Sequence, residues 1–157
     1  MARWYRWSMM ALILLVVWGC AKSSSLEAQV VDGKGQPIRF TKANNGVITD
    51  SVTGLDWYVG PNHDNNWHQA KAWTENLTVA GGGWRMPTVP ELKALYQKGA
   101  APNNMNPLFQ TTSVWVWSGQ LNDASSAWGL AFYNGKEGWH GLDYAYGRLA
   151  FAVRSRR

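Results

Sequence analysis

One short segment, residues 81–92 (GGGWRMPTVPEL), constrains the fold of this chain more than any other. Its three glycines allow positive φ values that other residues resist, so the backbone can turn sharply there. Thr88 can cap a helix, and Glu91 stands three residues later, as a capping box requires. The segment therefore predicts a helix that begins near Val89, preceded by a turn that directs Trp84 into the core.

The first nineteen residues resemble an export signal. Arg3 and Arg6 precede an uncharged apolar run over residues 9–18, which is too short to span a membrane as a mature helix. The run ends in the letters VWGC, which resemble the lipobox of bacterial lipoproteins, whose cysteine is lipidated. Residues 1–19 are thus predicted to be a lipoprotein signal peptide, with lipidation at Cys20. An ordinary secretory signal with an incidental cysteine is the alternative.

Small and polar residues from 20 to 37 predict a flexible tether, and one folded domain is expected from 38 to 157. Aspartate is absent next to Cys20, and the typical lipoprotein pattern then implies the outer membrane of a Gram-negative bacterium. Because Cys20 is the only cysteine, the domain has no intramolecular disulfide. Core burial must stabilise it, and eight of the eleven tryptophans follow the signal.

The formal net charge of +5 does not indicate a nucleic-acid partner. Arg3 and Arg6 belong to the signal, and Arg154, Arg156 and Arg157 crowd the C-terminus. We expect a solvated tail there, and contact with lipid headgroups or an acidic polysaccharide is the alternative. The rest of the domain is nearly neutral.

Hydrophobic periodicity and turn residues predict an α+β fold. The expected elements are a hairpin with strands at 47–49 and 55–58, helices from Asn65 or Asn66 to about Leu77 and from Val89 to about Lys98, an irregular loop over 100–112, and strands at 114–118, 127–133 and 149–154. Residues 135–147 carry four glycines and several aromatics, which is typical of an exposed loop.

A series of short motifs occurs in order along the domain. They are Arg39-Phe40-Thr41, Val47-Ile48-Thr49-Asp50, Thr53-Gly54-Leu55-Asp56-Trp57, Trp67, Gln69-Ala70, Asn76-Leu77, Trp84-Arg85-Met86-Pro87-Thr88, Glu91-Leu92, Pro107-Leu108-Phe109, Trp117-Ser118, Ala127-Trp128 and Val153-Arg154. The set resembles the Lcl C-terminal domain family, named for a bacterial collagen-like adhesin. The resemblance implies a C-type lectin-like fold, with two helices on twisted antiparallel sheets and a long-loop region that carries binding. It assigns structural roles to Trp84, Arg85, Pro87, Thr88, Glu91, Trp117 and Trp128, and we expect Trp84, Trp117 and Trp128 in the core.

The chain departs from the family pattern at three positions. Trp73 and Ala152 stand where members often have a pair of cysteines, and a large aromatic against a small residue could fill that space by packing. Asp56 replaces a usually apolar residue, and a turn or hydrogen-bond role is open.

Catalysis is not predicted, since the chain lacks the G-x-S-x-G and P-loop motifs and any cysteine nucleophile outside the lipobox. The residues that could form an acid-base or metal cluster are His63, Asp64, His68, His140 and Asp143. His63 and His68 are five apart, which does not place them on one helical face. Calcium is not expected either, because Asn122 and Asp123 supply too few oxygens. We predict no cofactor and no metal.

Binding is predicted for the last third of the domain, where aromatic, amide and basic side chains are dense. The candidate ligand-binding residues are Asn134, Lys136, Trp139, His140, Tyr144 and Arg148. For Trp139 and Tyr144, a place in the core is the open alternative. Aromatic faces can stack on sugar rings, and amides or basic groups can orient hydroxyls or sulfates. The predicted function is a lipid-anchored cell-envelope domain that binds a glycan, with acidic or sulfated glycans favoured, or a surface protein. The alternative is a structural envelope component that acts through protein–protein contacts alone.

Overall fold

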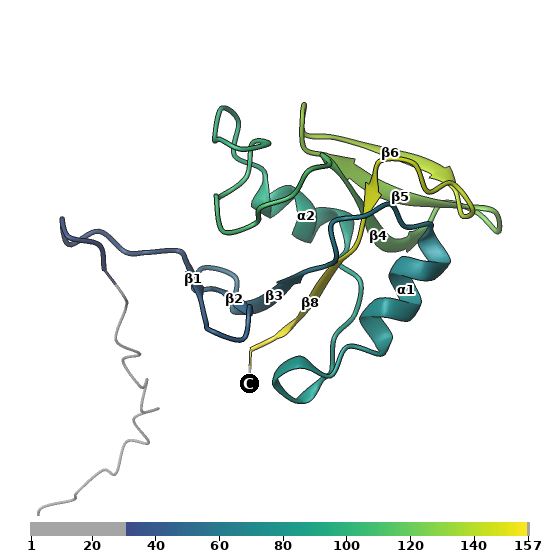
Figure 1. Ribbon diagram of the computed structural model, residues 1–157. Coiled ribbons are helices and arrows are strands. Elements are labelled where there is room, and N and C mark those ends of the chain that lie inside the picture. The colour runs from purple at the N-terminus through teal and green to yellow at the C-terminus, as the bar shows by residue number, and fades with distance from the viewer. Residues whose placement is uncertain (1–30, 157) are drawn as a thin grey trace, which may run out of the picture.

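The computed structural model describes residues 31–156, so the predicted signal peptide, Cys20 and most of the predicted tether lie outside the described residues. The described part contains two α-helices, a short 3₁₀-helix and eight β-strands, which confirms the α+β prediction (Figure 1). No helix within residues 31–156 is long and apolar enough to cross a membrane.

The first sheet joins the start and the end of the domain. Its strands are β1 (Phe40–Lys42), β2 (Ile48–Asp50), β3 (Leu55–Val59) and β8 (Phe151–Ser155), which are antiparallel and lie in the order β1-β2-β3-β8. The predicted hairpin is therefore confirmed as β2 and β3, and the last strand of the chain closes the sheet.

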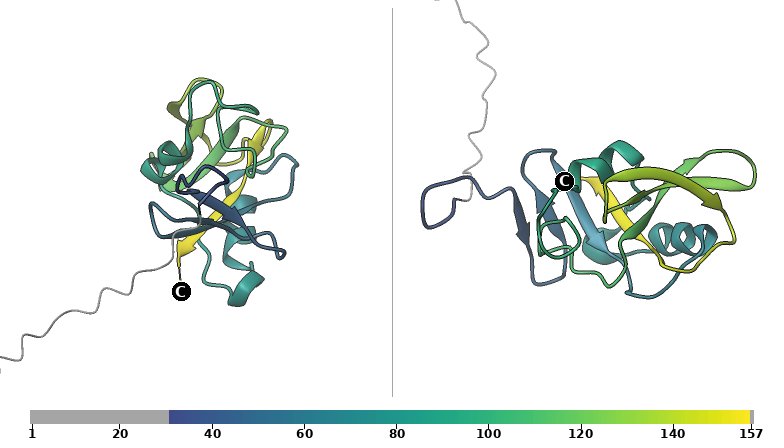
Figure 2. Two further views of the ribbon diagram at one scale, coloured as in Figure 1. Left: turned by 90° about the vertical axis from the view of Figure 1, so that its left-hand side faces the viewer. Right: turned by 90° about the horizontal axis from the view of Figure 1, so that it is seen from above.

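The second sheet carries most of the predicted ligand-binding residues. Its strands are β4 (Trp115–Leu121), β5 (Ser126–Ala131), β6 (Lys136–Gly141) and β7 (Arg148–Leu149), in the order β6-β5-β4-β7. β7 runs parallel to β4, whereas the other pairs are antiparallel. The β5–β6 hairpin lies with α1 at one end of the molecule, and β1 and β2 lie at the other end (Figure 2).

The prediction of an exposed loop over residues 135–147 is wrong for residues 136–141. These residues form β6 and pair with β5 along their whole length, from Lys136 opposite Ala131 to Gly141 opposite Ser126. Glycines and charged residues hide this strand in the sequence, because it is stabilised by its neighbour rather than by its own β propensity.

Both helices begin at capping boxes. In α1 (Trp67–Glu75) the cap is Asn66, paired with Gln69. In α2 (Val89–Leu95) the Thr88 hydroxyl accepts from the Glu91 N–H, as predicted. Both helices end two or three residues before the predicted limits. After α2 the chain turns away because the Gln97 N–H bonds to the Asn104 carbonyl at 2.7 Å.

The glycine segment forms a sharp junction between the helices, as predicted. It follows a 3₁₀-helix, η1 (Val79–Gly81), and residues 81–83 have φ values of 86°, 70° and 78°. Trp84 is 5% exposed, and its indole N–H donates to the Val79 carbonyl at 2.8 Å.

Arg154 holds this junction against the first sheet, so its prediction as part of a solvated tail is wrong. Its guanidinium lies over the Trp84 ring at 4.3 Å and donates to the carbonyls of Ala80 and Gly82. It also pairs with Asp56 at 3.3 Å, and both side chains are less than 10% exposed. Asp56, which departs from the family pattern, therefore has an ion-pair partner inside the domain.

The remaining motif residues join the junction to both sheets. Arg85 pairs with Glu91 at 2.5 Å and bridges Val153 of β8 through its backbone. The Pro87 carbonyl accepts from the Gly119 N–H of β4 at 2.8 Å. Trp117 is fully buried, as predicted.

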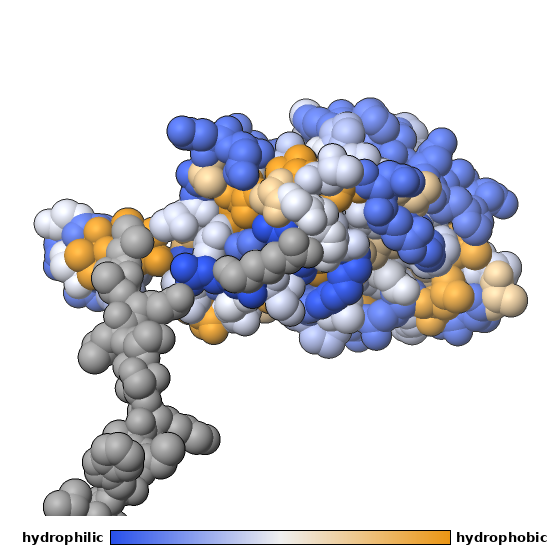
Figure 3. All heavy atoms as spheres, turned by 90° about the horizontal axis from the view of Figure 1, so that it is seen from below, coloured by the Kyte–Doolittle hydropathy of each residue, from blue (hydrophilic) through white to orange (hydrophobic). Residues whose placement is uncertain are grey.

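The main core lies between the two sheets, α2 and the irregular loop predicted over residues 100–112. That loop has no regular structure, and it inserts Met105 and Phe109 into the core, where both are 1% exposed. Trp73 packs against a smaller cluster that contains Ala152, so the two residues that depart from the family pattern lie in one packed region, as predicted. On the face seen from below, hydrophobic residues form small separate patches among hydrophilic ones (Figure 3).

Candidate binding site

The predicted ligand-binding residues divide between the two faces of the second sheet and the turn at its edge. Trp139 and His140 are neighbours on β6, and successive strand residues point to opposite faces. Asn134 and Lys136 lie at the β5–β6 turn, where the Asn134 side chain accepts from the Lys136 N–H at 3.0 Å. Tyr144 and Arg148 both contact the His140 side chain.

Trp115, which sequence reasoning did not assign to the site, forms the floor beneath these three residues. It lies across two glycines that pair with each other, Gly129 of β5 and Gly138 of β6. A Cβ on Gly129 would lie 2.7 Å from the Trp115 Nε1, and one on Gly138 would lie 3.0 Å from its ring. Only glycine at these positions leaves room for the indole to lie close to the sheet.

Arg148 lies between two aromatic rings. Its guanidinium carbon is 4.5 Å from the Trp115 ring centroid and 4.9 Å from that of Tyr144. One terminal nitrogen lies 2.9 Å from the His140 Nε2. Because a guanidinium can only donate, Nε2 accepts, and the imidazole is neutral with its proton on Nδ1. His140 in turn stacks on Tyr144, with centroids 5.3 Å apart.

Three loops are tied together around Arg148. The Asp64 carboxylate accepts from the Gly147 N–H at 2.9 Å, and the Ser113 hydroxyl donates to the Gly147 carbonyl at 2.6 Å. The Asn65 N–H donates to the Arg148 carbonyl at 2.9 Å. These bonds fix the backbone that carries Arg148, so the guanidinium is held in place before any ligand arrives.

Within the described part of the chain, no carboxylate neutralises the charge of Arg148. Arg39, Arg85 and Arg154 each form a salt bridge, whereas Arg148 has no carboxylate within salt-bridge distance among the described residues. Its Nε is buried without a hydrogen-bond partner. Burial lowers the pKa of Arg148, partly offset by nearby groups that include Asp64. A half-buried cation of this kind favours an anionic partner.

The surroundings of Arg148 also change the pKa of His140. Burial, and then the positive charge of Arg148, lower the pKa of its imidazole. The neutral form that accepts the Arg148 hydrogen bond is therefore the form that the folded domain prefers at neutral pH.

Trp139 lies apart from this cluster, on the other face of the sheet. It is 56% exposed and stands directly opposite Trp128. Trp128, expected in the core, is instead half-buried and forms a wall of a surface hollow.

The residues considered for catalysis or metal binding do not assemble. Within residues 31–156, no three His, Cys, Asp or Glu side chains come together in a way that could hold a metal ion. The Asp64 carboxylate accepts a hydrogen bond from the Gly147 N–H. The Asp123 carboxylate accepts from the Ser125 N–H in the β4–β5 turn, and this bond lowers the pKa of Asp123.

The part of the site that sequence reasoning missed is Trp115 with its glycine floor. Gly129 and Gly138 could have indicated it, since paired glycines in adjacent strands leave space for a ring above them. That signal needs the register of β5 and β6, and β6 itself was predicted as a loop.

Comparison with known families gives one match over most of the domain. The family model described as the Lcl C-terminal domain matches residues 46–154, which is more than half of the 157-residue chain. The matched range includes the glycine junction and the whole Arg148 cluster. A comparison with curated proteins gave no match.

Proposed function

Because this chain belongs to the Lcl C-terminal domain family, we propose that it is an adhesin-type binding domain that recognises an acidic or sulfated glycan through Arg148. The proposal includes a C-type lectin-like fold and a lipid anchor at Cys20 in the bacterial outer membrane. The anchor and tether would hold the domain at the surface of the outer membrane.

The observation that carries the proposal is the half-buried guanidinium of Arg148, which has no carboxylate partner in the part of the chain that the structure describes. Two aromatic rings and His140 fix its plane, so little freedom is lost when it binds. A sulfate or carboxylate on a sugar can accept two parallel hydrogen bonds from a guanidinium, which fixes orientation as well as charge. The bound anionic group would also neutralise the positive charge of the Arg148 guanidinium.

Tyr144 provides a surface for the sugar itself. It is 45% exposed and stacks on His140, which limits its motion. An exposed ring beside a fixed cation suits a sugar that carries both an apolar C–H face and an anionic substituent.

The test is a glycan array that includes sulfated and uronic-acid glycans with their neutral counterparts, probed with the purified chain with and without a chelator. We expect binding to the acidic members, weakened by salt because the contact is electrostatic. Chelation would abolish binding if calcium were required. Absence of binding to every acidic glycan would contradict the proposal and favour the structural alternative.

The lipid anchor has a separate test. Replacing Cys20 with serine should release the chain from membrane fractions, because the acyl chains attach to this sulfur. Continued membrane association of the Cys20→Ser variant would contradict the anchor while leaving the glycan site untouched.

A further inference from the structure

The face of the second sheet opposite Arg148 carries a hollow of about 310 Å³. Helix α2 and three strands line it with Val89, Pro90, Lys93, Gln120, Trp128 and Glu137. Trp139 lies on the same face, because it stands directly opposite Trp128 in the β5–β6 register. The half-buried Trp128 therefore lines the hollow, and the exposed ring of Trp139 stands next to Trp128 outside this lining.

The charged side chains that line the hollow neutralise each other. Lys93 and Glu137 form an ion pair at 2.7 Å, and both side chains are nearly half exposed. An anionic ligand would meet the Glu137 carboxylate, and a cationic one would meet the Lys93 ammonium. The hollow therefore differs from the Arg148 cluster, where the guanidinium has no carboxylate partner among residues 31–156.

The same groups offer both donors and acceptors. The Gln120 Oε1 accepts from the Val89 N–H at 2.7 Å, which fixes the amide and leaves its two N–H donors available. Lys93 adds donors, and Glu137 adds acceptor oxygens. A hydroxyl both donates and accepts, so a sugar ring with several hydroxyls matches this mixture better than an apolar ligand does.

From these observations we infer a second site, in which Trp139, Trp128, Lys93, Glu137 and Gln120 bind an uncharged pyranose ring of a glycan. The C–H face of the sugar stacks on Trp139, and its hydroxyls bond to Lys93, Glu137 and Gln120. The volume is at the lower end of the range for ligand pockets, which suits a single ring. This site does not depend on the Arg148 site, since the two lie on opposite faces of one sheet.

The test uses four neutral probes, namely cellotetraose, maltotetraose, mannotetraose and triacetylchitotriose, each titrated into the whole chain to about 10 mM. We expect at least one to bind with a Kd on the order of 1 mM. The tryptophan indole N–H signals in NMR spectra should identify the site, with those of Trp139 and Trp128 moving and that of the buried Trp57 unchanged.

Variants distinguish the site from non-specific binding. Trp139→Ala should weaken binding of the neutral probe about ten-fold, and Lys93→Met should weaken it several-fold. Tyr146→Ala is the matched control, since it removes another exposed aromatic, 78% exposed, outside the hollow. It should leave the affinity unchanged, as should Arg148→Gln.

Three results would overturn the inference: no neutral probe binding at about 10 mM, an unchanged affinity in Trp139→Ala, or a dimer in solution that Trp139→Ala converts to monomer. The last would show that a second copy of the chain covers the hollow. Loss of acidic-glycan binding in Arg148→Gln, with neutral binding retained, separates this site from the proposed function.

Discussion

Replacing Gly129 with alanine tests whether Trp115 lies on the sheet as described. The added methyl carbon would lie 2.6 Å from the Val116 carbonyl oxygen and 2.7 Å from the Trp115 Nε1. The first contact is with the backbone of the neighbouring strand, so a rotamer change cannot relieve it. β4 and β5 must separate locally, and the Trp115 ring must rise.

Overpacking of this kind costs about 1–3 kcal/mol, offset by about 0.4–1 kcal/mol because alanine restricts the unfolded chain. We therefore expect Gly129→Ala to lower the free energy of unfolding by about 1–2 kcal/mol. The matched control is Gly141→Ala on β6, whose methyl would meet only the Ser125 carbonyl oxygen, at 3.9 Å. That variant should be as stable as the wild type or slightly more stable.

The assay is urea unfolding followed by tryptophan fluorescence, with the free energy of unfolding obtained by linear extrapolation. If Gly129→Ala and Gly141→Ala had the same stability, Trp115 would not lie against β5. The description of the Arg148 cluster, which depends on that ring as its floor, would then be refuted.

Three further predictions concern the ion pair, the histidine and the helix cap. Asp56→Ala leaves Arg154 buried without its carboxylate and should cost roughly 3 kcal/mol or more in urea unfolding, and a loss below about 1 kcal/mol would contradict a structural role for the pair. Because the pKa of His140 is lowered in the folded state, its contribution to stability is complete above the ordinary value of 6.5 and is lost as the pH falls through the folded pKa. The melting temperature should therefore drop less between about pH 7.5 and about pH 5 in His140→Gln than in the wild type, and equal drops would contradict the lowered pKa. Thr88→Ala should cost about 1 kcal/mol in urea unfolding while Thr88→Ser costs little, and equal stability of the two variants would show that the cap contributes nothing.

Local signals in the sequence were sufficient for the elements whose structure depends on near neighbours. The glycine junction and the Thr88 cap were predicted because all the groups involved lie within a few residues of one another. The β2–β3 hairpin was predicted for the same reason. Helix ends were less well predicted, because the chain leaves α2 through bonds to Asn104, which no local pattern reveals.

Long-range partners explain the remaining differences. Arg154 is a C-terminal arginine in a basic run, and it is buried through contacts with residues far away in the sequence, namely Asp56, which lies 98 residues away, and Trp84. β6 is a strand because β5 pairs with it. Both features depend on contacts that sequence periodicity does not contain.

The candidate site was predicted in its residue types but not in its arrangement. Arg148, His140 and Tyr144 were identified from composition, and the structure brings them together. Composition could not show that Trp139 faces the other way, because that requires β6 to be a strand with alternating faces. Nor could it show that Arg148, unlike three other arginines, has no carboxylate partner within residues 31–156.

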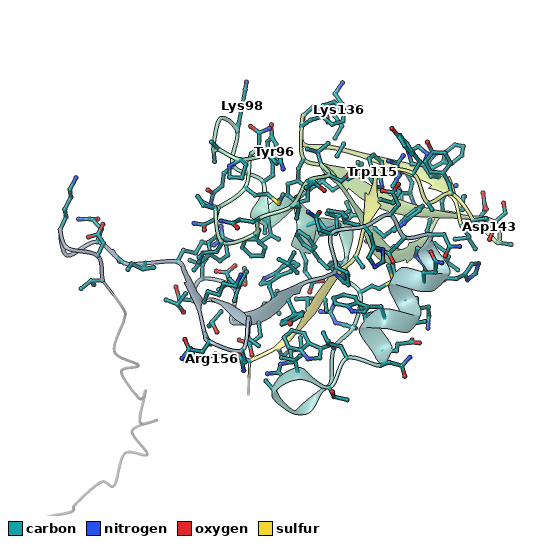
Figure 4. All side chains as sticks on the ribbon, in the orientation of Figure 1. Tyr96, Lys98, Trp115, Lys136, Asp143 and Arg156 are labelled. Carbon is teal, nitrogen blue, oxygen red and sulfur yellow. The ribbon has the colours of Figure 1, made fainter. Side chains whose placement is uncertain are left out.

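The central claim is that Arg148 binds the anionic group of a glycan, and the most direct test is the affinity of Arg148→Gln for a heparin hexasaccharide. Lys98→Gln is the charge-matched control, since Lys98 is exposed and projects outward at the upper left of the molecule, with Trp115 nearer the middle and Asp143 at the right-hand edge (Figure 4). Hydrogen bonds to charged groups contribute about 1.5–3 kcal/mol, so Arg148→Gln should raise the Kd about ten-fold or more. Lys98→Gln should change it less than about two-fold, because a distant exposed charge is screened. Equal changes in the two variants, or an unchanged Kd in Arg148→Gln, would contradict the claim.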